Sequence, residues 1–283
     1  MKRLLGVICL VAILGIMGTS SWAAGSLKVA GSTTVLPISQ LWAEEFMTKH
    51  SGVSISVSGG GTGTGISSLL NGTIDIANAS REASEKEIDT AKARNEKLVG
   101  TKIAKDGLAV IVNPANNVKN LTMAQLKAIY SGSATSWNQV GGNASRAIVV
   151  VGRDSSSGTY GFFQEAVLGG GSYVKGMLSQ PSNAAVAQTV SQSKEAIGYV
   201  GLAYAEEFAK KGKVRILSIS TKTGEAGRVP TAATVQSGTY PLWRYLYCYT
   251  LGKPKGVAAE FIKFGLSKEG QELVKQAEYL PLK

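Results

Sequence analysis

AIVVVGRDSSSGTYGFF, residues 147–163, changes character twice along its length. The β-branched run 147–151 predicts a buried strand, and the segment 157–169 predicts a helix. Between them the chain places Arg153, Asp154, three serines and Gly158-Thr159. Because a strand, a turn and a helix in succession form the repeating unit of α/β folds, this stretch decides the fold class. Its turn carries more charge and more hydroxyl groups than a structural loop needs, which favours a binding role.

The same alternation of short β-like runs and amphipathic stretches extends along the chain, without an internal repeat or a long linker. Strands are expected at 27–30, 53–58, 74–80, 107–113 and 240–250, and helices at 37–50, 66–72, 84–97, 257–266 and 268–277. A second set of such segments is 121–132, 147–151, 157–169, 183–193 and 196–204. The pattern predicts an α/β protein with a mainly parallel sheet, in one large or two modest domains.

The first residues have the features of a targeting segment. Lys2 and Arg3 precede an apolar run over 4–18, and small residues follow, which predicts a signal peptide at 1–23, cleaved after Ala23. The alternative is a membrane anchor, but the run is shorter than the ~20 residues that a spanning helix needs. Cys9 lies too early in this segment to be a lipid-attachment site, so we expect a periplasmic protein without a lipid tether.

Cysteine usage and net charge narrow the possible crosslinks and partners. Cys248 is the only cysteine after the leader, so no internal disulfide is expected. The formal net charge of +11 favours an anionic partner. Nucleic acid is not expected, since 210–215 (KKGKVR) is the only dense basic cluster.

Catalysis has little support in the sequence. The single histidine, His50, stands at an expected helix end, where we expect it to be solvent-exposed, far from the serine-rich turns. No cluster of Cys, His or carboxylates with metal-ligand spacing occurs, so we expect no metal, no cofactor and no enzyme activity. Asp154 is better suited to an ion pair or to accepting a proton than to acid catalysis.

Four turns share one composition. They are GSTTV (31–35), GGGTGTG (59–65), ASR (79–81) and GRDSSSGT (152–159), each at the carboxyl end of an expected strand and, except after ASR, before a helix. Helix starts offer free N–H groups and a partial positive charge, and ligands bind at this edge of open α/β sheets.

Each turn taken alone has a structural alternative. Ser and Thr often only cap helices, Arg153 could form a surface salt bridge, and the glycine-rich turn lacks the lysine of a P-loop. Their recurrence, with Arg81 and Arg153 as planar cationic forks, predicts a site for a small anion rich in acceptor oxygens.

These residues also resemble a known family. The blocks GSTTVLPI, GGGTGTGISSLLNGTIDIANASR, LKAIYSGSATSWNQVGG, GRDSSSGTYGFF, AIGYVGLAYA and YPLWRYLYCYT are similar, in order, to those of the phosphate-binding component of bacterial phosphate ABC transporters. The resemblance covers essentially the whole chain after the leader.

The resemblance implies a type II periplasmic-binding-protein fold, in which two α/β lobes close over the ligand. The first lobe would comprise 24–110 and 245–283 and the second 111–244, with 107–113 and 240–250 carrying the chain between them. Phosphate would bind without metal or cofactor. The closed form, a monomer, would contact an inner-membrane permease transiently.

The resemblance also assigns ligand-binding positions. They are Ser32, Thr33, Thr34, Thr62, Ser80, Arg81, Arg153, Ser157, Gly158 and Thr159. Some family members have an aspartate, where this chain has Ser80, that accepts the proton of hydrogen phosphate and so excludes sulfate. Its absence leaves Asp154, or a backbone carbonyl nearby, as the expected acceptor.

Three alternatives remain open. The ligand could be another tetrahedral oxyanion such as sulfate or molybdate. The protein could be an exported phosphatase-like enzyme, or it could use the same fold for adhesion or signalling.

Overall fold

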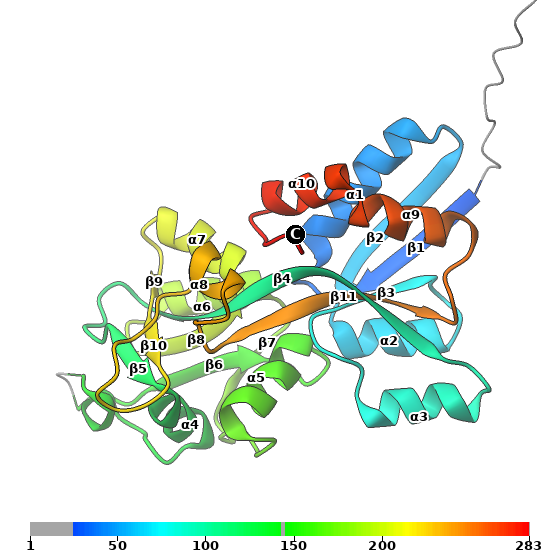
Figure 1. Ribbon diagram of the computed structural model, residues 1–283. Helices are drawn as coiled ribbons and strands as arrows, with labels where there is room; N and C mark the ends of the chain where they lie inside the picture. Colours follow the sequence, from blue (N-terminus) through cyan, green and yellow to red (C-terminus); the bar gives the residue numbers. More distant parts are fainter. Residues whose placement is uncertain (1–24, 143–144, 283) are drawn as a thin grey trace, which may run out of the picture.

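Two long strands, β4 (Leu98–Val112) and β11 (Trp243–Leu251), run side by side across the middle of the molecule (Figure 1). They pair antiparallel from Leu98↔Leu251 to Gly107↔Trp243, with one register shift between Leu246 and Tyr247. The structure is a computed structural model that describes residues 25–142 and 145–282. The expected signal peptide and Cys9 lie outside these residues.

The elements to one side of these strands form what we call the first lobe. They are β1 (Gly25–Gly31), α1 (Leu36–Lys49), β2 (Val53–Gly60), α2 (Thr62–Leu70), β3 (Ile76–Ala79), α3 (Glu85–Ala93), α9 (Gly256–Leu266) and α10 (Lys268–Gln276). β1 pairs in parallel with both β2 and β3. Helices cover both faces of this sheet, and α9 and α10 lie beside α1 (Figure 1).

The elements on the other side form the second lobe. They are β5 (Asn120–Thr122), α4 (Met123–Ser131), the 3₁₀ helix η1 (Trp137–Val140), β6 (Val149–Arg153), α5 (Gly158–Leu168), β7 (Leu178–Gln180), α6 (Asn183–Gln192), β8 (Ala196–Gly201), α7 (Leu202–Lys210), β9 (Arg215–Ile216), β10 (Ser218–Ser220) and α8 (Ala232–Gln236). β6 pairs in parallel with β7 and β8.

One curled sheet links the lobes, with strand order β2-β1-β3-β11-β4-β8-β6-β7 over the described residues. Parallel pairs occupy its two ends, and β11 and β4 make the antiparallel centre. The expected α/β fold with a two-lobed arrangement is therefore confirmed, and each lobe contributes a parallel section.

Separate buried clusters stabilise the lobes. In the first lobe, Trp42 and Phe46 of α1 pack edge-on against Phe261 of α9. In the second, Tyr130 and Phe163 are wholly buried among the side chains of the parallel strands. Each such side chain contributes about 1.5–3 kcal/mol of burial free energy, so each lobe has a core of its own.

Local chemistry sets the helix starts, and two expectations need correction. Ser84 caps α3 in a capping box with Glu87, as the sequence predicts for a helix beginning at that serine. α2 begins at Thr62, earlier than the expected 66, because Gly61 at φ 98° turns the chain into the helix. His50 is half-buried rather than exposed, since its ring stacks on Phe46 at 3.9 Å between centroids.

Candidate anion-binding site

The first and fourth turns meet across the lobe boundary. Thr34, just before α1, places its Oγ1 3.3 Å from Oγ1 of Thr159, in the first turn of α5. Both side chains are fully buried. Next to them, the N–H of Thr34 donates to Oγ of Ser32, so the first turn is folded back on itself and directs its polar groups at α5.

The second and third turns meet at the same place. Thr62, the first residue of α2, accepts a hydrogen bond from the N–H of Ser80 and lies 3.5 Å from the Ser80 hydroxyl. Gly158 of the second lobe faces this pair, because a Cβ on it would lie 2.3 Å from Thr62 Oγ1 and 2.6 Å from Ser80 Oγ. The structure thus brings all four predicted turns together, and only glycine permits this approach.

Ser157 and Gly158 begin α5 at the centre of the site. Oγ of Ser157 accepts from the N–H groups of Thr159 and Tyr160 at 3.1 and 3.3 Å, which makes Ser157 the N-cap. A hydroxyl that accepts in this way still has its own proton to donate. The cap role that the sequence leaves as an alternative therefore does not exclude a ligand role.

Arg153 is a buried cation without a carboxylate partner among the described residues. Its side chain is 1 % exposed, and its Nε and Nη2 donate to the carbonyl oxygens of Gln180 and Pro181. Burial lowers the pKa of the guanidinium, which is the direction expected for a charge withdrawn from water. A charge in this position is costly unless an anion compensates it.

The other two charged residues of the predicted site have partners within their own lobe. Arg81 forms a bidentate pair with Glu87 at 2.7 and 2.8 Å and also donates to the carbonyl of Glu82. Oδ1 of Asp154 accepts from the N–H and the hydroxyl of Ser156. Their roles toward a ligand stay predictions.

Ser156 also fastens the glycine-rich turn to the second lobe. The N–H of Gly63 donates to the carbonyl of Ser156 at 2.8 Å, and a Cβ on Gly61 would lie 2.6 Å from its Oγ. Because the first lobe approaches through backbone alone, the run of glycines here has a steric cause.

Sequence reasoning missed three side chains that contact the first turn. Nδ2 of Asn183, the first residue of α6, donates to Thr34 Oγ1 at 3.0 Å. The hydroxyl of Tyr204 donates to the carbonyl of Thr33 at 3.0 Å. The third is Arg244 of β11, whose Nη2 lies 3.4 Å from Thr34 Oγ1. None stands in a Ser/Thr/Gly turn, so composition gave no signal for the first two.

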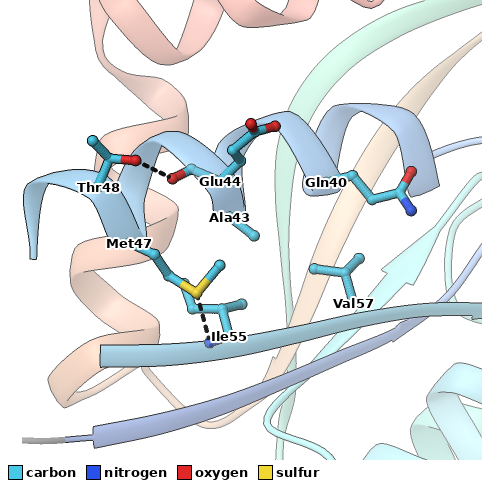
Figure 2. Close-up of a pocket in the computed structure, with 7 residues that line it drawn as sticks. All are labelled: Gln40, Ala43, Glu44, Met47, Thr48, Ile55 and Val57. Carbon is cyan, nitrogen blue, oxygen red and sulfur yellow. Dashed lines mark hydrogen bonds between the residues drawn. The ribbon is translucent and has the colours of Figure 1, made fainter. Parts of the chain in front are cut away.

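Two cavities lie near these elements and differ in chemistry. A cavity of about 650 Å³ adjoins the site, between Arg81, the start of α5 at Tyr160 and strand β11. A second, of about 550 Å³, lies on the outer side of the first lobe between α1 and the edge strand β2 (Figure 2). Glu44 is its one charged lining residue, so it is unsuited to an anion.

Residues 25–142 and 145–282 lack two features. No group of three or more His, Cys, Asp or Glu side chains is placed to hold a metal ion. Among the helices of these residues, none is both long and apolar enough to cross a membrane.

Comparison with known proteins places this geometry in a family. Residues 18–269 match the family model of the PBP superfamily domain. The chain is 33 % identical to the phosphate-binding protein PstS of Pseudomonas aeruginosa, over 93 % of its own length and 85 % of that protein. It is 35 % identical to PstS of Bacillus subtilis, over 92 % and 82 %.

Solved structures agree with the curated relatives. A putative phosphate ABC transporter substrate-binding protein from Clostridium perfringens, solved with bound phosphate, superposes with a TM-score of 0.79 at 30 % identity, covering 91 % of this chain and all of that one. An ABC-type phosphate transport receptor from Vibrio cholerae has a TM-score of 0.71 at 30 % identity, covering 90 % and 99 %. The chain therefore belongs to the PBP superfamily and, within it, to the PstS family of phosphate-binding proteins.

Proposed function

We propose that this protein binds inorganic phosphate in the periplasm and delivers it to the permease of an ABC transporter. The observation that carries the proposal is Arg153, a buried guanidinium with no carboxylate partner among the described residues, in one of four turns whose hydroxyl and N–H groups meet. A small tetrahedral anion satisfies both the charge and the donors. The phosphate-binding relatives and the phosphate-bound structure from Clostridium perfringens support this choice of anion.

Within the site, each group has a proposed part. Arg153 pairs with two phosphate oxygens, and Arg81, held beside the cleft by Glu87, adds positive potential. The remaining donors are the hydroxyl or N–H groups of Ser32, Thr33, Thr34, Thr62, Ser80, Ser157, Gly158 and Thr159. No metal or cofactor takes part.

The wider arrangement is proposed on the same basis. Residues 24–110 with 245–283 form one lobe and 111–244 the other, behind a signal peptide at 1–23. The protein acts as a monomer that contacts the permease transiently, without a lipid tether. Its family consists of substrate-binding components of transporters rather than enzymes.

Selectivity is the point at which a second ligand deserves a test. Ser80 stands where an aspartate would accept the proton of hydrogen phosphate, so the site is rich in donors and poor in acceptors. Such a site favours a fully ionised oxyanion such as sulfate unless another acceptor acts. We propose Asp154, through its oxygen Oδ2, as that acceptor.

Titration calorimetry tests the proposal on protein that lacks residues 1–23 and has been stripped of phosphate. Phosphate and sulfate are titrated separately near pH 6 and pH 8. Tight binding of phosphate with little heat from sulfate supports the proposal. Equal binding of both makes the protein a general oxyanion carrier, and silence with both overturns the proposal.

Matched variants identify the residues that bind the anion in the calorimetric titration. Arg153→Met removes the buried cation, whereas Arg146→Met removes a guanidinium whose side chain is 65 % exposed in a surface pair with Glu195. Only the first should abolish binding. An Asp154→Asn protein that keeps its preference for phosphate would clear Asp154 of the acceptor role. Failure to cleave a chromogenic phosphate ester excludes phosphatase activity.

A further inference from the structure

Arg244 is a second buried cation at this site, on a strand rather than in one of the turns. Arg244 is 4 % exposed. It pairs with Asp106 of β4, directly opposite in the ladder, through Nε at 3.0 Å and Nη2 at 2.8 Å to the same oxygen, Oδ2. The other oxygen of Asp106 accepts from the N–H of Leu202. Asp106 therefore fixes the guanidinium in one orientation.

The planar shape of the Arg244 guanidinium determines which of its edges is available to a ligand. Nε and one proton of Nη2 lie along one edge, and that edge holds Asp106. The second proton of Nη2 lies with Nη1 along the other edge. Since Nη2 also reaches Thr34 Oγ1 at 3.4 Å, the second edge is the one that faces the first turn of the site.

Nη1 on that edge has no partner. Of the buried side-chain atoms in the described residues, three lack one: Arg215 Nε, Arg244 Nη1 and the Tyr279 hydroxyl. The guanidinium of Arg215 is occupied with the carbonyls of Asn116 and Val118, and Tyr279 is neutral. Only Arg244 combines an unpaired donor with a positive charge next to Thr34. Leaving such a donor unpaired is costly, so a partner is expected.

Arg244 also contacts both lobes and lies close enough to Arg153 to affect its pKa. Its Cζ lies 5.5 Å from the ring centroid of Phe162 in α5, while Thr34 belongs to the first lobe. Burial lowers the pKa of Arg153, the charge of Asp154 acts to raise it, and the charge of Arg244 acts to lower it, so the two cations are near enough to interact. Asp106 pairs with Arg244, whereas no carboxylate among the described residues forms an ion pair with Arg153.

We propose that Arg244 is a ligand-binding residue, which donates from Nη1 to the same oxyanion that Arg153 binds. This rests on the proposed function and adds a residue to that site. Asp106 acts as a positioning residue, since it holds the guanidinium without touching the ligand. The anion then bridges the two lobes and the crossing strand β11 at once.

The test compares the parent protein with Asp106→Asn/Arg244→Gln. The double variant removes both charges together, so it leaves neither charge unpaired in the interior. The phosphate Kd from calorimetry should rise about 10- to 100-fold, the effect of losing one hydrogen bond to a charged group. Arg146→Gln/Glu195→Gln, the same change in the exposed pair, should leave Kd unchanged.

Two results overturn the inference. A double variant that is less stable but binds phosphate with the parent Kd shows a structural role alone. A parent protein that binds no phosphate overturns this inference together with the proposed function, and its own titration reveals that case first.

A measurement on the parent protein covers the case of a double variant that fails to fold. The side-chain Nη–H resonances of Arg244, assigned by comparison with Arg244→Lys, should shift and exchange more slowly with solvent when phosphate is added. Resonances that stay unchanged at saturating phosphate contradict contact between Nη1 and the anion.

Discussion

Thr34 and Thr159 place their hydroxyl oxygens 3.3 Å apart although 125 residues separate them in the chain. One belongs to the start of α1 and the other to the start of α5, so the two lobes touch through the groups proposed to bind phosphate. At this distance one hydroxyl donates to the other. Because that bond uses one of the two protons, an anion that accepts from both hydroxyls must replace this contact between the lobes.

This contact makes Thr159→Val informative, since valine keeps the shape and removes the hydroxyl. We expect the phosphate Kd to rise roughly 10- to 100-fold, because a hydrogen bond to a charged ligand is lost. The stability of the ligand-free protein should change by no more than about 1 kcal/mol. Calorimetry and thermal unfolding measure the two effects. Thr189→Val on α6 is the control, since its hydroxyl bonds only its own helix, at the carbonyl of Ala185. Equal losses in both variants would contradict a ligand role for Thr159.

Gly158→Ala should leave folding intact while it prevents the two lobes from closing. Alanine is favourable by roughly 0.5–1 kcal/mol over glycine in a helix, so the isolated lobe tolerates it. Its methyl group would, however, overlap Thr62 and Ser80 of the other lobe. We expect an unchanged or raised melting temperature together with a loss of phosphate binding.

Small-angle scattering should show a larger radius of gyration for Gly158→Ala in phosphate than for the parent protein. Gly176→Ala in the same lobe is the control, because its methyl group would have no heavy atom within 4 Å. Normal binding by Gly158→Ala would mean that the two lobes do not approach each other here.

The environment of the Glu87 carboxyl predicts that the free energy of unfolding depends on pH. Burial acts to raise the pKa of its carboxyl, but the bonds from Arg81 and from the N–H of Ser84 outweigh burial and hold the pKa below its usual 4.5. A lowered pKa in the folded state means that stabilisation is present above the unfolded pKa and is lost as pH falls through the folded pKa. Glu87→Gln should therefore cost about 1 kcal/mol at pH 7 and less near pH 3. Denaturant unfolding at the two pH values measures this, with Glu85→Gln as control. A constant difference would exclude linkage through this carboxyl.

Cys248 should be chemically silent in the folded protein. Burial raises the pKa of its thiol to about 12, and the side chain has no exposed surface. Since the thiolate is the reactive form, a disulfide reagent at pH 8 should label it only after denaturant is added. Rapid labelling of native protein would indicate that β11 opens readily.

The sequence predicted the fold because the signals were local. The strand at 147–151 and the serine cap at Ser84 each follow from a short run of residues, and the structure has both. β4 extends to Leu98, well before the expected start at 107, because its first part is polar and gains its pairing from β11, which lies far along the chain. Such partners are invisible to a local pattern.

The sequence predicted the site residues that lie in turns of similar composition, and it missed the residues that lie outside such turns. Four turns of one composition pointed to one place, and the structure brings them together. Asn183 is not the N-cap of α6 and does not lie in one of the four turns, so no sequence pattern marked it as a site residue. Arg244 did have one. In the alternation of 243–250 it shares the inward face with Leu246 and Cys248, and an arginine among apolar positions is unusual enough to ask for a partner.

The crossing of β4 and β11 has a mechanical consequence. These strands form one hydrogen-bonded ribbon, and the register shift pairs Leu246 with Ala104 but Tyr247 with Lys102, so Ile103 is an extra residue on β4. A ribbon of this kind resists sliding and shearing but bends and twists where such a bulge interrupts it. Ile103, Ala104 and Leu246 are all buried in the core of the first lobe, so packing holds this bulge in one shape. Any rotation of one lobe against the other therefore bends both strands together, on the second-lobe side of this packed segment.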